Sequence, residues 1–238
     1  MKSKSIRIDR LISKHLNINR RDTRLMLAQG RIEINDSAIT EINTVVTQFD
    51  RVVLDGRVIS EHIPVYIMLH KPIGVVSATQ DTLHKTVIDL LPSNFVSKDL
   101  HIVGRLDLNT TGLLLLTNDG AWSRKLMSPD TKVSKVYQVT LQNDLNMEYI
   151  SAFAEGMFFP FEGITTQPAT LTIISNKVAE IILKEGKYHQ IKRMFGRFRN
   201  PVLALHRSSI GNLHLDKKLK EGESRMLTSD EVSGIFTN

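Results

Sequence analysis

An unbroken apolar run, residues 113–116, is the feature of this sequence that most constrains its fold. These four consecutive leucines lack the polar alternation of a strand with one face in water, and such a run is typical of a strand buried on both faces. Other elements must therefore cover both sides of the sheet that contains this strand. The chain has 238 residues, of which 41% are hydrophobic, so it can supply such a core as one large domain or as a small domain followed by a medium one.

Strands outnumber helices in the pattern beyond residue 64. Besides 113–118, the segments predicted as strands are 65–69, 75–79, 135–142, 169–175, 179–186 and 202–215. The segments predicted as helices are 85–92, 119–129 and 188–199. Because helices do not alternate regularly with strands, we expect an α+β fold whose sheet is mixed and mainly antiparallel.

The first sixty residues form a smaller unit. Apolar residues recur at helical spacing over 8–16, and a second helix is bounded by Asn19 as its N-cap and by Gly30 after its end. Short strand-like segments follow, two of which flank Asp55-Gly56, a strong hairpin signal. Residues 60–66 resemble a linker. We therefore expect a small α/β domain over residues 1–61 and a larger domain over residues 62–238.

Positive charge is clustered in two parts of the chain. The net charge is +6; residues 1–60 contain 11 Lys and Arg against 7 Asp and Glu, and residues 184–207 contain seven basic residues against one acid. Clustered positive charge favours a polyanionic partner, above all nucleic acid. In the first cluster the arginines that stand close together are Arg20, Arg21, Arg24 and Arg31. Two interpretations explain the clustering of these arginines about equally well: a helix face exposed to solvent, and a surface that contacts RNA.

Several classes of protein are disfavoured. No run of eighteen apolar residues is present, and the basic N-terminus is not followed by the apolar segment of a signal peptide. The absence of cysteine excludes disulfides and thiolate metal sites and fits a cytoplasmic location. Phosphate-binding glycine loops, zinc-protease motifs and nucleophile elbows are absent, and the eight histidines lack ligand spacing. We therefore expect no membrane partner and no metal.

Asp107 is the first candidate catalytic residue. It follows Arg105 in the loop that leads into the leucine run. A nearby positive charge keeps a carboxylate ionised, and an ionised, positioned Asp can act as nucleophile or general base. The alternative is that Asp107 caps a turn and pairs with Arg105 on the surface, which spacing alone favours.

The predicted helix 188–199 is the second candidate site. Its apolar residues Ile191, Met194, Phe195 and Phe198 face a core, whereas His189, Arg193 and Arg197 fall on one face with Lys192 beside it. Such a basic ridge can neutralise phosphates and bring one cation to a buried carboxylate. The alternative is a solvated amphipathic helix, which explains the near absence of acids poorly.

Two further residues have a functional and a structural interpretation. Tyr137, in an alternating strand, can stack on a base, although a core tyrosine with a hydrogen-bonded hydroxyl is the more common case. Lys71 precedes Pro72 in a loop that either borders a site or is a simple turn, and the turn is favoured.

Four motifs in order then resemble a known family. "YIMLHKPIGVV", "GRLDLNTTGLLLLTNDG", "SKVYQVTL" and "EGKYHQIKRMF" are similar to the motifs of the RsuA-type pseudouridine synthases, the RsuA/RluB/RluE/RluF family. The resemblance covers nearly the whole chain: residues 5–60 look like an S4 RNA-binding module, and residues 62–238 look like the catalytic domain. The segment "KYHQIKRMF…LALHRSSIG" is most similar to the RsuA branch.

The resemblance implies roles for individual residues. Asp107 matches the catalytic aspartate, and Arg105 matches an arginine that holds the flipped-out site open. Tyr137 matches a tyrosine that packs against the target base. Whether this tyrosine also transfers a proton is left open by the resemblance. The basic residue that pairs with Asp107 is Lys192 or Arg193, and Lys192 is favoured. The residues expected to contact RNA are Arg20, Arg21, Arg24, Arg31, Lys71, His189, Arg197 and Arg199.

The resemblance also implies a substrate and a setting. It implies isomerisation of a uridine of 16S rRNA, at position 516, by a cytoplasmic monomer that uses no metal or organic cofactor and acts on the rRNA or on a small-subunit assembly intermediate. Two alternatives are a synthase acting on 23S rRNA and a non-catalytic RNA-binding assembly factor. One departure is Arg199-Asn200-Pro201, where we expect a glycine to end the helix; Pro201 can end it instead.

Overall fold

The computed structural model describes residues 5–96 and 99–237. The chain divides into two compact units, one of Met1–Pro64 with Asp119–Ala121 and one of Val65–Asn118 with Trp122–Asn238. The first four residues of the expected domain 1–61 lie outside the described residues.

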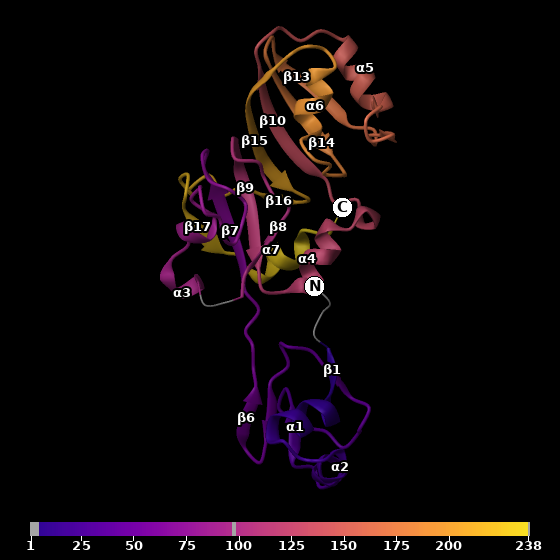
Figure 1. Ribbon diagram of the computed structural model, residues 1–238, viewed down its shortest axis with the longest axis vertical. Coiled ribbons are helices and arrows are strands. Elements are labelled where there is room, and N and C mark those ends of the chain that lie inside the picture. Colours follow the sequence, from indigo (N-terminus) through magenta and orange to yellow (C-terminus); the bar gives the residue numbers. More distant parts are fainter. Residues whose placement is uncertain (1–4, 97–98, 238) are drawn as a thin grey trace. The chain divides into compact units, whose positions relative to one another are not determined.

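Two helices and two small sheets form the N-terminal unit (Figure 1). Its elements are β1 (Ile6–Arg7), α1 (Ile8–Leu16), α2 (Arg20–Ala28), β2 (Ile32–Ile34), β3 (Ser37–Ala38), β4 (Val45–Val46), β5 (Val52–Leu54) and β6 (Arg57–Ser60). β3, β2, β5 and β6 form an antiparallel sheet in that order, and β1 pairs with β4. Helix and sheet share one small core, whose most buried members are Ile8, Ile12, Leu27, Ile32 and Val52.

Local signals set the boundaries within this unit. The side chain of Asn19 accepts a hydrogen bond from the Asp22 N–H and caps α2, as expected for an N-cap asparagine. Asp55 and Gly56 both have positive φ, 49° and 76°, which is the geometry of a type I′ hairpin turn between β5 and β6. Both predictions from the sequence are therefore confirmed.

A nine-stranded sheet forms the second unit (Figure 1). Its strands are β7 (Tyr66–Lys71), β8 (His101–Val103), β9 (Thr110–Thr117), β10 (Lys135–Leu141), β13 (Thr170–Ser175), β14 (Val178–Leu183), β15 (Val202–Ile210), β16 (Leu213–His214) and β17 (Ser224–Met226). The order is β13-β14-β10-β15-β9-β7-β17, with β8 on β9 and β16 on β15. β9 and β15 are parallel and the other pairs are antiparallel, which confirms the predicted mixed, mainly antiparallel sheet.

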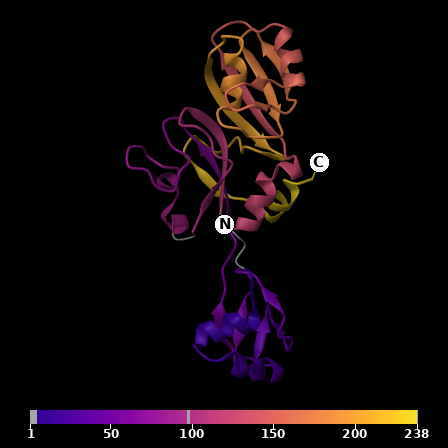
Figure 2. The same ribbon diagram turned by 45° about the vertical axis from the view of Figure 1, so that its right-hand side comes forward.

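Helices cover both faces of this sheet (Figures 1 and 2). The helices and short hairpin strands are α3 (Ser93–Val96), α4 (Gly120–Met127), α5 (Glu148–Glu155), β11 (Phe158–Phe159), β12 (Ile164–Thr165), α6 (Gln190–Gly196) and α7 (Ser229–Gly234), with 3₁₀ turns η1 (Ile88–Leu90) and η2 (Pro129–Thr131). Leu114 and Leu116 of β9 belong to the core beneath α5 and α6. Leu113 and Leu115 belong to the core beneath α4 and α7. The leucine run is thus buried on both faces, as predicted.

The prediction of a strand over 75–79 is wrong. It makes an isolated bridge, Val76 to Thr86, and does not join the sheet. The reason is Ser77, whose hydroxyl donates to the Leu106 carbonyl and accepts from the Leu106 N–H. These bonds tie the segment to the loop before β9. The helix predicted over 85–92 is likewise only the single turn η1, which ends at Leu90, two residues before Pro92.

Helix α6 is shorter than the predicted 188–199. His189 has a φ of 48°, in the left-handed region, so the helix begins after it. At the other end Arg199 takes the left-handed conformation, φ 51°, and the bonds Arg199 N–H to Gly196 O and Asn200 N–H to Phe195 O form a Schellman motif. Arg199 thus occupies the position where a glycine was expected, and it precedes Pro201. Across residues 5–96 and 99–237, no helix has the length and apolarity needed to span a bilayer.

Candidate active site

Asp107 lies in the loop between β8 and β9. The Thr110 N–H donates to the Asp107 carbonyl at 3.0 Å and closes the turn that starts β9. The side chain of Asp107 is 31% exposed, so the carboxylate is at the edge of the core and within reach of a ligand. This placement matches the sequence expectation of an acid at the mouth of a buried strand.

Each carboxylate oxygen of Asp107 faces one basic side chain. His189 Nε2 lies 3.3 Å from Oδ1, and Lys192 Nζ lies 3.2 Å from Oδ2. Arg193, the other basic residue considered for this role, instead pairs with Glu162. The exposed Arg105 is not among the ion-pair partners of Asp107 in the described residues. The surface pair Arg105–Asp107, which spacing alone favoured, is therefore not formed.

The fold of α6 explains why Lys192 reaches this carboxylate. Ile191, Met194 and Phe195 are buried, and they fix the helix against the sheet. Lys192 lies between these core positions and is about one-third exposed, so its side chain extends towards the loop of Asp107. His189 stands just before the helix, and its left-handed backbone places the ring at the other carboxylate oxygen.

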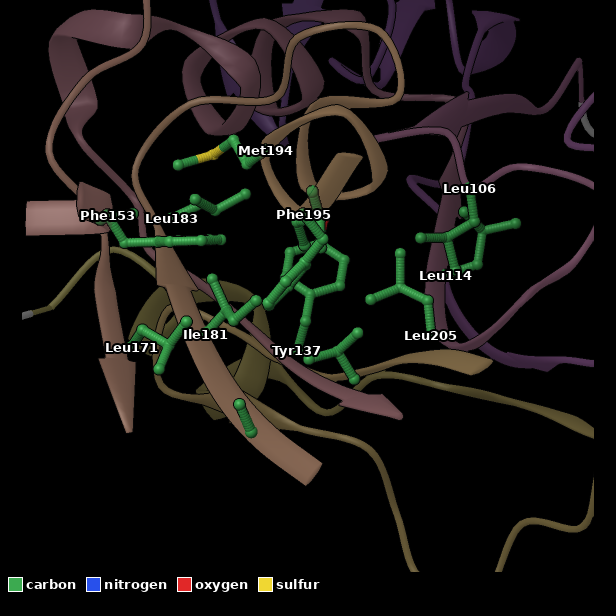
Figure 3. Close-up of a cluster of buried hydrophobic side chains, with 14 of the residues drawn as sticks. Leu106, Leu114, Tyr137, Phe153, Leu171, Ile181, Leu183, Met194, Phe195 and Leu205 are labelled. Atoms are coloured by element: carbon green, nitrogen blue, oxygen red, sulfur yellow. The ribbon is translucent and has the colours of Figure 1, made fainter. Parts of the chain in front are cut away.

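A cavity opens in front of the Asp107 carboxylate. Its polar side is lined by Asp107, His189 and Lys192. Its apolar side is lined by Leu106, Tyr137, Leu183, Ile191 and Leu205. Figure 3 shows Leu106, Leu114 and Leu205 on one side of Tyr137 and Phe153, Leu171, Ile181 and Leu183 on the other. The site therefore combines one charged edge with a wall of apolar side chains.

Tyr137 both lines the apolar side of the cavity and belongs to the hydrophobic core. Its side chain is 8% exposed, and it lies in β10 opposite Ile181 and Arg207 of the neighbouring strands. Its hydroxyl accepts a hydrogen bond from Arg207 Nη1 at 3.4 Å. The structure thus combines the two interpretations of this residue, because a core tyrosine with a bonded hydroxyl also lines the cavity.

Lys71 is a buried support of the Asp107 loop. Its ammonium group is 0% exposed and donates to the carbonyls of Pro72, Leu108 and Thr110 at 2.9, 3.3 and 2.9 Å. Burial lowers the pKa of Lys71 to about 8, and the Asp107 carboxylate opposes that shift. The structure corrects the expectation that Lys71 contacts RNA, because none of its surface is accessible and its ammonium group donates its hydrogen bonds to three carbonyls.

Arg207 is a second buried cation beside the site. It is 1% exposed, and its guanidinium donates to the carbonyls of Leu113 and Gly104 at 2.8 and 2.7 Å as well as to Tyr137. Gly104 starts the loop of Asp107, so one side chain connects that loop, the leucine strand and the tyrosine. In the sequence, Arg207 stands out only as one of the seven basic residues of the segment 184–207.

The predicted basic ridge of His189, Arg193 and Arg197 is not a continuous phosphate-binding face. His189 is directed to Asp107, Arg193 pairs with Glu162, and Arg197 Nη1 donates to the Phe158 carbonyl at 3.1 Å. The physical reason is that α6 packs against the hairpin of β11 and β12. Arg193 and Arg197 bond residues of that hairpin. Arg199 remains exposed at the end of the helix.

The arginines of the N-terminal unit fall into two groups. Arg20, Arg21 and Arg24 are exposed on α2. Arg31 instead pairs with Asp55, with Nε and Nη2 donating to the two carboxylate oxygens at 2.8 and 2.5 Å. This bidentate pair holds two exposed side chains at the β5–β6 turn.

Three residues at the site were missed by the sequence analysis or given another role. They are Ser77 and Arg207, which hold the loop, and His189 as a partner of Asp107. A signal existed for Arg207, because it alternates with Leu205 and Ser209 on the buried face of β15. Over the described ranges, no group of three His, Asp or Glu side chains is arranged to hold a metal ion.

Comparison with known proteins gives a consistent relationship. A family model described as RNA pseudouridylate synthase matches residues 65–196. The chain is 44% identical over 231 residues to the ribosomal small subunit pseudouridine synthase A of Pseudomonas aeruginosa, covering 97% of this chain and 100% of that protein. The protein of the same name from Vibrio cholerae is 38% identical with the same coverage. A solved structure described as a pseudouridylate synthase superposes with a TM-score of 0.70 at 34% identity and covers 97% of this chain and 99% of that one.

Proposed function

Because the chain belongs to the RNA pseudouridylate synthase family, we propose that it isomerises a specific uridine of small-subunit rRNA to pseudouridine, with Asp107 as the catalytic residue. The observation that carries the proposal is the Asp107 carboxylate, held between Lys192 and His189 at the edge of an apolar cavity. The small-subunit target rests on the names of the relatives, and the finer proposal is position 516 of 16S rRNA.

The reaction exchanges one bond for another. The bond between the ribose and the uracil nitrogen breaks, the base rotates, and a ring carbon joins the ribose. That carbon loses its hydrogen as a proton and the freed nitrogen gains one, so the product is an isomer. Asp107 starts the exchange, either by attacking the sugar or by removing a sugar proton, and each route needs an ionised carboxylate.

Two basic side chains lie against the Asp107 carboxylate. Lys192 Nζ is 3.2 Å from Oδ2, and its positive charge attracts and orients the carboxylate. His189 Nε2 lies 3.3 Å from the second oxygen. With both oxygens held, the carboxylate has a fixed direction towards the cavity, which lowers the entropic cost of reaching a productive geometry.

The apolar wall has its own part in the reaction. A detached uracil must stay in the site while it turns, and water must stay out. Tyr137, Leu106 and Leu205 present carbon surface to the base and exclude water. The uridine must first leave its stack in the RNA, at a cost of a few kcal/mol. Contacts with the rest of the RNA must offset that cost.

The N-terminal unit is proposed as an S4-like module that provides part of these contacts. Arg20, Arg21 and Arg24 are exposed on one short helix, α2. Each phosphate neutralised releases counterions, so this binding weakens as salt rises. The exposed Arg105 beside Asp107 is proposed to hold the vacated position in the RNA open.

One experiment tests the catalytic proposal directly. Asp107→Asn keeps the shape of the side chain and removes its charge. We expect the purified variant to form no pseudouridine in an rRNA transcript while it binds that transcript as tightly as the unchanged protein. A variant that still forms product would contradict the role of Asp107, and an unchanged protein that forms none would favour the alternative of a non-catalytic assembly factor.

A second experiment tests the target. Pseudouridines are mapped in the rRNA of cells that lack this protein. We expect one mark to disappear from 16S rRNA and to return when the gene is restored but not when Asp107→Asn is supplied. A mark missing from 23S rRNA instead would support the alternative of a large-subunit synthase.

A further inference from the structure

We propose that the tip of the β11–β12 hairpin and helix α6 form a stacking subsite, in which an unpaired base of the substrate RNA packs on Phe161 while Arg197 binds a neighbouring phosphate. The inference rests on the proposed function, because it supplies contacts to RNA whose uridine occupies the cavity at Asp107. It concerns residues outside that cavity.

Phe161 is the most exposed large apolar side chain in the described residues, at 99%. It stands at the tip of the turn between β11 and β12, which the hydrogen bond from the Gly163 N–H to the Pro160 carbonyl closes at 3.3 Å. By contrast, Phe159 is 6% exposed and belongs to the core. Phe161 therefore contributes nothing to the core, and its ring is available to a ligand.

The hairpin that carries Phe161 is held at several points. Glu162 pairs with Arg193 of α6, and the Arg193 guanidinium lies 4.1 Å from the centre of the Phe159 ring. At the base of the hairpin, Lys187 Nζ donates to the Thr165 carbonyl at 3.0 Å. A ring on a fixed support loses little entropy when a base stacks on it, which favours binding.

A shallow hollow lies between this tip and α6. It is lined by Phe159, Pro160, Phe161, Glu162, Arg193, Gly196 and Arg197. Gly196 forms an open part of its wall, because a Cβ added there meets no atom within 4 Å. The hollow thus has a flat aromatic side and a cationic side, which is the combination that binds single-stranded RNA.

The charge of the hollow favours an anionic group such as a phosphate. The one acid, Glu162, is neutralised by Arg193. Among the described residues, the Arg197 side chain makes one hydrogen bond, to the Phe158 carbonyl, and a guanidinium group has five donors. The remaining donors of Arg197 can bind a phosphate oxygen in the fork geometry that arginine favours.

The subsite is close to the catalytic cavity. Lys192, which reaches Asp107, and Arg197 are on or just after the same helix, about 8 Å apart along its axis. Arg193 and Arg197 border the hollow on another side of α6 from Lys192, so the proposal has the RNA pass around the end of the helix and place a nearby nucleotide in the hollow.

Three variants test the subsite with a short oligouridylate and with a small-subunit rRNA fragment. Phe161→Ala should weaken binding of both RNAs about 5- to 150-fold, the range of one lost base–aromatic stack. Its salt dependence should not change, because stacking releases no counterions. Arg197→Gln should lower the slope of log affinity against log salt by roughly 0.7. Gly196→Leu should weaken binding by filling the hollow.

Two controls separate binding from folding. Ile174→Ala removes another exposed apolar side chain, 56% exposed, and should leave affinity unchanged. Phe161→Trp should retain binding, and its emission should be quenched by RNA, which is readable because the chain has one other tryptophan, the buried Trp122. Phe161→Ala, Phe161→Trp, Arg197→Gln and Ile174→Ala should keep the unfolding temperature of the unchanged protein, and Gly196→Leu, which replaces a helical glycine, should not lower it.

The outcomes distinguish this inference from the proposed function. Equal RNA affinity of Phe161→Ala and the unchanged protein, with unquenched Phe161→Trp, overturns the subsite even if pseudouridine is formed. If Phe161→Ala weakens RNA binding but the unchanged protein forms no pseudouridine, the subsite is supported and the proposed activity is overturned. Loss of binding only to small-subunit particles that contain ribosomal proteins, and not to naked RNA, assigns Phe161 to a protein partner and overturns the proposal.

Discussion

The ammonium group of Lys192 lies 3.2 Å from the carboxylate of Asp107, whereas the guanidinium of the adjacent Arg193 is bonded to Glu162. Two consecutive basic residues of α6 thus form ion pairs with different acidic residues, on different sides of the helix. Both members of the Lys192–Asp107 pair are about one-third exposed. Solvent screens such a pair, so its contribution to the free energy of unfolding is expected to be below about 1 kcal/mol.

The first prediction separates these two residues. Lys192→Met should lower the single-turnover rate of pseudouridine formation by roughly 10²- to 10³-fold, because the charge that orients and stabilises the reacting carboxylate is lost. Its unfolding temperature should change by only a few degrees. Arg193→Met is the matched control and, at saturating RNA, should keep most of the single-turnover rate even if its RNA affinity falls. Comparable loss of rate in the two variants would contradict the assignment of Lys192 to Asp107.

The second prediction concerns His189. Asparagine tolerates the left-handed backbone that His189 adopts, so His189→Asn removes the imidazole without adding strain. Losing the polar contact of His189 with the carboxylate, 3.3 Å long, should reduce the single-turnover rate about 3- to 10-fold. His62→Asn, in the exposed segment before β7, provides the control. An unchanged rate in His189→Asn would show that the 3.3 Å contact with Asp107 has no role in the reaction.

Periodicity explains which parts of the fold could be predicted. The leucine run of β9, the alternation of β10 and the Asp55-Gly56 turn each depend on local chemistry, and each is found as expected. The segment 75–79 could not be predicted in the same way. Its Val-Val pair favours a strand, but the two bonds of Ser77 to Leu106 are long-range and leave no local trace.

The residues of the candidate site could be proposed from the sequence, but their geometry could not. Spacing alone favours a surface role for Asp107, and only the resemblance of several motifs raised it to a catalytic candidate. Nothing local shows that Lys192 rather than Arg193 faces Asp107, because that depends on how α6 packs through Met194 and Phe195. Buried cations such as Lys71 are the hardest case, since polar residues are ordinarily placed on the surface.

The third prediction compares two glycines. In Gly112, with φ of 108°, an added Cβ lies 2.3 Å from the Arg207 carbonyl oxygen, so Gly112→Ala forces β9 and β15 apart. It should lower the free energy of unfolding by at least about 2–4 kcal/mol. Gly196→Ala meets open space within a helix and should raise it by about 0.5–1 kcal/mol. Denaturant titration measures both, and a stable Gly112→Ala would contradict the close contact of the strands.

The fourth prediction concerns Arg207. Its guanidinium is buried and bonds the carbonyls of Gly104 and Leu113, so Arg207→Met leaves two buried acceptors without partners. The free energy of unfolding should fall by about 2–5 kcal/mol. Arg199→Met, at an exposed arginine, is the control and should stay within about 0.5 kcal/mol. A similar effect of the two changes in denaturant titration would contradict the anchoring role of Arg207.

The last prediction uses the pKa of Lys135. This lysine of β10 is 6% exposed, and burial, with a smaller effect of nearby Arg207, lowers its pKa to about 8 from 10.5. Between pH 8 and 10.5 the unfolded chain holds a proton that the folded chain has released, so raising the pH in this window favours the folded state, by at most about 1.4 kcal/mol per pH unit.

Below pH 8 both states of Lys135 are protonated, and the folded protein bears the full cost of burying the charge. Lys135→Met removes that cost and keeps the length of the side chain. The stability of this variant relative to the unchanged protein should therefore be greatest below pH 8 and should decrease steadily towards pH 10.5. Urea titrations of both proteins across this range measure the difference, and titrations of the buried Lys71 cancel because both proteins contain it. The exposed Lys177→Met controls for the loss of one positive charge. A difference that stays constant with pH, or that grows as the pH rises, would show that Lys135 is not a charged residue held in the core.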